Sequence, residues 1–203
     1  MKIIKILFYI ILVSLNSITH SIGEDFNSWV ISFKEYAFKQ GVSKETLDKT
    51  MSKVKFLPNV IKYDRYQPEF YEDTYTYIEK RTNQKKLSNG KSLFIKNENL
   101  ILDIENEFDV EKELLLSLMG IETNFGKYLG KMDILSSLST LSFDKRRSEF
   151  FTNELIIILK LIDSGTVDSD ILYGSWAGAF GNFQFMPSTI KNYALDYNND
   201  DLI

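Results

Sequence analysis

Apolar residues recur at intervals of three and four along most of this 203-residue chain, a spacing typical of amphipathic helices. The chain contains three prolines and few runs of alternating polarity that would indicate strands. Residues 146–162 are apolar on almost every side, so we expect this helix to lie in the middle of a core. The sequence therefore predicts an all-α domain.

Local signals predict where several elements begin and end. Ser43 is placed to cap a helix, and Pro187 suits the first turn of another. Residues 94–108 show the spacing of one amphipathic helix. The polar stretch 81–89 is predicted to be an exposed connection, and residues 58–68, which begin and end with proline, are predicted to be irregular.

The residue types present exclude several kinds of catalytic site. The chain has no cysteine and a single histidine, His20. Because His20 lies in the leader described next, a Ser-His-Asp triad, a Cys-His pair and a zinc site with His or Cys ligands are excluded. Acid–base chemistry must come from carboxylates, lysine or tyrosine, and we expect no cofactor. The net charge of −4 argues against nucleic acid as a partner.

Residues 1–23 have the three regions of a secretory signal peptide. Lys2 and Lys5 precede the apolar run 6–15, and small residues at 21 and 23 are typical of a cleavage site. The run is about half of the roughly 20 residues that a membrane-spanning helix needs, although an uncleaved anchor is the alternative. We expect a periplasmic protein without a stable membrane span after leader removal, with residues 24–203 as one domain.

Glu122, near the end of a predicted helix, is the most informative carboxylate. Leu115, Leu118 and Met119 precede it by seven, four and three residues and share its helix face. Burial and the negative end of the helix dipole would both favour the protonated carboxyl that a general acid needs. A frayed helix end that turns the side chain toward solvent is the alternative. The catalytic interpretation therefore predicts that Glu122 is shielded from water.

The segment 174–188, GSWAGAFGNFQFMPS, combines small residues with aromatic ones. Its glycines and alanines allow backbones to approach closely. Aromatic faces beside the amide of Gln184 suit a sugar ring, which needs an apolar surface and partners for its hydroxyl groups. A helix-packing corner with core aromatic residues is the alternative.

Taken together, these segments resemble the B-type lytic murein transglycosylases. The resemblance is carried in order by 64–70 (DRYQPEF), Tyr77, 120–126 (GIETNFG), 138–143 (LSTLSF), Arg146-Arg147 with Phe150-Phe151, 174–188, and Tyr193-Ala194 with Asp196. These motifs cover nearly the whole chain after the leader. Several motifs in a consistent order are more specific than any one of them.

The resemblance implies a lysozyme-like helical domain that cleaves the MurNAc–GlcNAc β-1,4 bond of peptidoglycan and leaves a 1,6-anhydro-muramoyl end. Glu122 would be the sole catalytic carboxylate, acting first as acid and then as base on the sugar's own 6-hydroxyl. No second carboxylate is needed, because no water has to be activated. Peptidoglycan glycan strands are the implied partner.

The resemblance also implies roles for individual residues. Ser175 would hydrogen-bond Glu122, and Gln184 would contact the sugar or that carboxylate. The remaining expected substrate contacts are Phe185, Met186 and Tyr77 in saccharide subsites and Arg146 and Arg147 on acidic peptide stems. A solvated helix start is the alternative for the two arginines.

The last residues match only the beginning of a calcium loop. Asp196, Asn198 and Asp200 fit its first ligand positions, but Asp201 stands where a turn glycine belongs and the sequence stops at Ile203. We therefore expect no metal site. Family members continue further, so we expect a domain incomplete at its C-terminus. The alternative function is a catalytically impaired, peptidoglycan-binding remnant.

Overall fold

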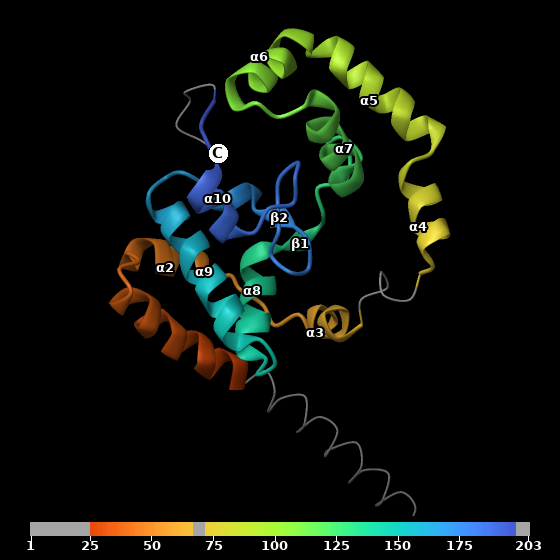
Figure 1. Ribbon diagram of the computed structural model, residues 1–203. Coiled ribbons are helices and arrows are strands. Elements are labelled where there is room, and N and C mark those ends of the chain that lie inside the picture. Colours follow the sequence, from red (N-terminus) through yellow and green to blue (C-terminus); the bar gives the residue numbers. More distant parts are fainter. Residues whose placement is uncertain (1–24, 67–71, 198–203) are drawn as a thin grey trace, which may run out of the picture.

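The computed structural model describes residues 25–66 and 72–197 (Figure 1). A first helix covers 25–39. The further helices are α2 (Lys44–Thr50), α3 (Pro58–Arg65), α4 (Thr74–Arg81), α5 (Gln84–Lys96), α6 (Glu98–Phe108), α7 (Lys112–Thr123), α8 (Ile134–Phe143), α9 (Ser148–Asp163), a 3₁₀ turn (Ser169–Ile171) and α10 (Pro187–Tyr193). Two short antiparallel strands, β1 (Met132–Asp133) and β2 (Tyr173–Gly174), accompany them. The predicted helical fold class is confirmed.

Helices α8 and α9 form the centre of the core. Every residue of α8 from Ile134 to Ser142 is buried, and α9 buries Phe151, Leu155 and Ile158 among others. Helices α2, α3 and α10 pack around this pair (Figure 1). The prediction that the apolar segment 146–162 is a central helix is confirmed, because a helix that is apolar all round is stable only when it is covered on all sides.

Two of the predicted helix starts are confirmed. The Ser43 side chain accepts a hydrogen bond from the Thr46 amide at 3.1 Å, and Pro187 occupies the first turn of α10. The prediction of an irregular segment from residue 58 is wrong, since α3 begins at Pro58. A proline in the first helical turn loses no intrahelical hydrogen bond, so it starts this helix instead of breaking it.

Helices α4, α5 and α6 form an arc along one side of the molecule, with α7 inside it (Figure 1). The predicted connection at 81–89 is wrong, because α5 starts at Gln84 and Asn83 caps it by accepting from the Lys86 amide. The single helix predicted for 94–108 is two helices that meet at Asn97. Neither α4 nor α5 contains a buried residue, so this arc is packed much less densely than the core.

None of the helices in the described ranges combines the length and apolar character required to cross a membrane. The predicted signal peptide lies outside the described residues.

Candidate functional site

The motif at 120–126 ends α7 in a tight turn. Asn124, Phe125 and Gly126 all have left-handed backbone conformations, with φ of 51°, 61° and 76°. The turn folds the Phe125 ring back over Gly120, where an added Cβ would lie 2.7 Å from the ring. The motif therefore needs glycine at 120 so that the helix can end directly after Glu122 and Thr123.

Thr123 connects this helix end to the glycine-rich loop. Its hydroxyl is buried, donates to the Asn182 carbonyl at 2.8 Å and accepts from the Gly126 amide at 2.9 Å. This role of Thr123 could not be predicted from helical spacing, because nothing in that spacing pairs position 123 with a loop 59 residues further on. The geometry makes it the residue that fixes the position of the neighbouring Glu122 relative to the loop.

The Glu122 side chain is exposed to solvent and makes no hydrogen bond or ion pair with a described residue. The prediction that it is shielded is wrong, and the solvent-facing alternative holds. Its apolar neighbours Leu118 and Ile121 are each 43% exposed, and α7 buries only Gly120 and Thr123. The end of α7 therefore leaves Glu122 open to solvent.

Glu122 lines a cavity of about 350 Å³. The other lining residues come from the start of α5 and the end of α7: Asn83, Lys85, Lys86, Asn89, Ile121, Thr123, Asn124 and Tyr128. Glu122 is the single carboxylate in this lining, which the described residues form. A cavity of this size with a few polar groups is within the range of small-ligand sites.

Ser175 and Gln184 bond to the loop itself instead of to Glu122. The Ser175 hydroxyl accepts from the amides of Ala177 and Ala179, at 3.3 and 3.0 Å. The Gln184 amide donates to the carbonyls of Leu129 and Gly181, at 3.1 and 3.0 Å. The structure contains no hydrogen bond of the predicted kind between Ser175 and Glu122, and the Ser175 hydroxyl instead closes the turn that shapes the loop.

Phe185 and Met186 face different surroundings. Phe185 is 46% exposed and stacks on Phe183, with ring centroids 5.9 Å apart. Met186 is partly buried against the hydrophobic core and precedes α10. Phe185 thus offers an open aromatic face of the kind a sugar ring needs, whereas Met186 is partly covered by the core.

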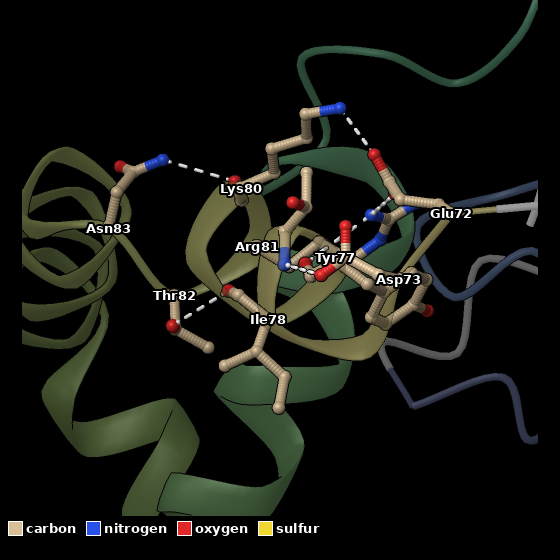
Figure 2. A network of polar contacts seen from close by, with 9 residues as sticks. Glu72, Asp73, Tyr77, Ile78, Lys80, Arg81, Thr82 and Asn83 are labelled. Atoms are coloured by element: carbon tan, nitrogen blue, oxygen red, sulfur yellow. Dashed lines mark hydrogen bonds and ion pairs between the residues drawn. The ribbon is translucent and has the colours of Figure 1, made fainter.

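Tyr77 lies in a polar network on α4 (Figure 2). The Arg81 guanidinium sits over its ring, 3.6 Å from the centroid, and Glu72 pairs with Arg81 at 3.2 Å and with Lys80. The hydrogen bond from Lys80 lowers the pKa of Glu72. This network holds Tyr77 on the arc of helices, and Tyr77 is not among the described residues that line the Glu122 cavity.

Arg146 and Arg147 both pair with the buried Asp64. The Arg146 guanidinium lies 2.6 Å from one carboxylate oxygen, and Arg147 bonds to the other. Both arginine side chains remain partly exposed, at 49% and 38%. Two guanidinium groups on one carboxylate leave one positive charge in excess at the start of α9. None of these three residues is among the described residues that line the Glu122 cavity.

A second cavity, of about 520 Å³, lies between α5 and α7 and is mostly apolar. Leu87, Phe94, Ile95, Leu116 and Phe125 are among its lining residues, and Glu122 is not. In the described ranges no three acidic or histidine side chains are grouped so that they could hold a metal ion. Of the predicted calcium-loop positions, only Asp196 is among the described residues.

The fold and the site together define a lysozyme-like helical domain in which one glutamate ends a helix beside a glycine-rich loop. The family model described as transglycosylase SLT domain matches residues 25–203. The chain belongs to this family of transglycosylase domains.

Relatives of known name agree with this assignment. The chain is 43% identical over 94 residues to the membrane-bound lytic murein transglycosylase B of Escherichia coli K12. This aligned region covers 46% of this chain and 26% of that protein. SltB3 of Pseudomonas aeruginosa, solved with NAG-NAM-pentapeptide, matches 87% of this chain with a TM-score of 0.84 and 30% identity. SltB1 of the same organism matches 86% with a TM-score of 0.78.

The matched region is only part of each relative. The chain spans 47% of the SltB3 structure and 60% of the SltB1 structure. The SltB3 protein was also solved with NAG-anhNAM-pentapeptide, again with a TM-score of 0.84.

Proposed function

We propose that this protein is a lytic transglycosylase that cleaves the MurNAc–GlcNAc β-1,4 bond of peptidoglycan. The observation that carries the proposal is the position of Glu122, the glutamate of the transglycosylase motif, as the single carboxylate in the described lining of an open cavity. The Thr123 bond to the loop holds that glutamate beside the segment 174–188. Complexes of SltB3 with a muropeptide and with its anhydro form support the substrate and product class.

Glu122 would act twice in the proposed reaction. It first donates its proton to the glycosidic oxygen as the C1–O bond of the muramoyl residue breaks and the leaving sugar departs with a free hydroxyl. The muramoyl 6-hydroxyl oxygen then bonds to C1, and its proton returns to the Glu122 carboxylate. No water is consumed, so the second carboxylate of ordinary glycosidases is not required. The nucleophile belongs to the substrate, which gives the ring closure an intramolecular advantage.

The site residues expected from the sequence divide into contacts and supports. We propose that the open face of Phe185 packs on a sugar ring and that Tyr77 and Met186 line flanking subsites. Ser175 and Gln184 are held in loop hydrogen bonds, so they would reach a sugar or Glu122 only by exchanging those bonds when substrate enters. The charge left over by the Asp64 pairing allows Arg146 and Arg147 to attract acidic peptide stems.

The decisive test is the product released from purified sacculi. Wild-type protein is expected to release muropeptides with 1,6-anhydro ends, detected by mass spectrometry as products lighter by one water than hydrolytic ones. Glu122→Gln is expected to abolish the release, because the side-chain amide is too weak an acid to protonate the glycosidic oxygen. Reducing-ended products would instead establish hydrolysis, and unchanged release by Glu122→Gln would remove Glu122 from the mechanism.

Non-catalytic peptidoglycan binding is the second candidate function. The exposure of Glu122 and the use of the Ser175 hydroxyl in loop hydrogen bonds favour it. This candidate predicts that wild type and Glu122→Gln sediment equally with sacculi and that neither releases soluble product.

We infer that the protein acts outside the cytoplasm, in the periplasm. The signal-peptide pattern of residues 1–23 and the cell-wall relatives support this inference. Fractionation with N-terminal sequencing tests it: the expected mature protein starts near residue 24, whereas an intact Met1 in the membrane fraction would indicate an anchor.

A further inference from the structure

The cavity beside Glu122 is cationic at its α5 end. Lys85 and Lys86 line it together with Asn89, Tyr128 and Glu122. The two lysines outnumber the one carboxylate in the described lining, so the cavity keeps a positive charge even when Glu122 is ionised. A cavity with that balance attracts anionic groups.

The placement of these lysines works against the stability of their own helix. Both lie in the first turn of α5, which contains no acidic residue. A helix N-terminus carries partial positive charge, so lysine is unfavourable there and an anion is favourable. An anionic ligand in the site would offset this unfavourable placement. The helix N-terminus and the two lysines would then both attract the ligand.

Lys85 and Lys86 differ in what they already bind. The Lys86 ammonium donates to the Gly120 carbonyl at 3.0 Å, which ties α5 to the last turns of α7 and leaves its other N–H groups available. The Lys85 side chain is exposed and makes no ion pair or hydrogen bond with any described residue. Arg146 and Arg147, in contrast, already share Asp64. The two lysines are therefore the cations that line this cavity among the described residues, and both keep unused donors.

We propose that this cavity binds a carboxylate of the stem peptide on the muramoyl residue, with Lys85 as the main ionic contact and Lys86 as the second. The proposal rests on the proposed function, since it assumes a peptidoglycan ligand. The site would distinguish peptide-bearing glycan from uncharged chito-oligosaccharide and would anchor the muramoyl residue beside Glu122.

The test measures binding in the Glu122→Gln background, where no turnover can occur. The ligands are GlcNAc–MurNAc-pentapeptide and uncharged chitotetraose, titrated calorimetrically at low and high salt. Lys85→Gln is expected to weaken binding of the pentapeptide ligand roughly fivefold at low salt and to make that binding less dependent on salt. The affinity for chitotetraose is expected to stay unchanged. Lys86→Arg should retain binding. Lys96→Gln, which removes an exposed charge at the far end of the same helix, is the matched control.

Equal effects of Lys85→Gln and Lys96→Gln, an equal loss for both ligands, or no binding of the pentapeptide ligand would each overturn the proposal. Its failure is separable from that of the proposed function. Anhydro products with lysine-independent binding would refute only the lysine site, whereas lysine-dependent binding without cleavage would refute only the catalytic function.

Discussion

Thr123 joins α7 to the glycine-rich loop through one buried hydroxyl. Thr123→Val keeps the shape of the side chain but leaves the Gly126 amide and the Asn182 carbonyl without this partner. We expect a loss of about 2 kcal/mol in the free energy of unfolding, the cost typical of an unsatisfied buried polar group. Chemical denaturation measures it.

Thr82→Val provides the control for this residue. The Thr82 hydroxyl, directly after α4, is exposed and donates to the Ile78 carbonyl in the last turn of that helix, at 2.9 Å. Its removal should change stability by less than about 0.5 kcal/mol. If the two variants lose the same stability, the Thr123 hydroxyl is not a link between the helix and the loop.

Asp163 connects two helix ends, the C-terminus of α9 and the N-terminus of α2. Its carboxylate accepts from the Ser43 amide at 3.2 Å, from the Ser43 hydroxyl, and from the Thr46 hydroxyl at 2.5 Å. The hydrogen bonds from Ser43 and Thr46 lower the pKa of Asp163. A carboxylate whose pKa is lower in the folded state stabilises the protein above the pKa of the unfolded chain, and loses that contribution as the pH falls through the folded value.

Asp163→Asn should therefore destabilise the protein at pH 7, and the difference from wild type should shrink as the pH falls below about 4. We expect a loss of roughly 1 kcal/mol in the free energy of unfolding at pH 7. Hydrogen bonds to a buried charge would contribute more, but this side chain is exposed. Urea denaturation between pH 2.5 and 7 measures the difference. Asp170→Asn, at an exposed carboxylate in the 3₁₀ turn, is the control, and a pH-independent deficit in Asp163→Asn would contradict the linkage.

Helices whose own sequence contains a clear start residue or a clear apolar pattern were predictable from the sequence. The α9 segment is apolar on all sides, and Ser43 and Pro187 are standard helix starts. Helix α5 was missed because Ser88, Asn89 and Gly90 have low helix propensity, although the Asn83 cap is a signal that marks its start. Tertiary contacts with α6 and α7 stabilise this helix in spite of its composition.

The site was predictable in composition but not in geometry. Glu122 does lie in the last turn of its helix, as its spacing indicates. Periodicity shows which face of α7 is apolar, but not whether another element covers that face, and here Leu118 and Ile121 stay 43% exposed. The partners of Ser175 likewise depend on the local turn, which residue types alone do not specify.

The molecule as a whole combines a dense core with a sparsely packed arc. Helix α8 is buried from Ile134 to Ser142, whereas α4 and α5 bury no residue and expose Tyr75, Leu87 and Ile95 by 75%, 50% and 72%. Segments with few buried apolar contacts open locally at a free energy below that of global unfolding. The arc is therefore expected to open without the core.

Native-state hydrogen exchange tests this expectation. Amides of α4 and α5 should exchange on the order of 100-fold faster than those of α8 and α9. The opening free energy measured for amides of α8 and α9 should equal the free energy of global unfolding. Uniform protection would instead show that the arc and the core unfold as one unit.

Because Lys85 and Lys86 lie on α5 and Glu122 on α7, a stem-bearing muropeptide that bridges them should slow exchange in α5 selectively and leave α8 unchanged. Substrate binding would then complete the packing that the arc lacks in the free protein.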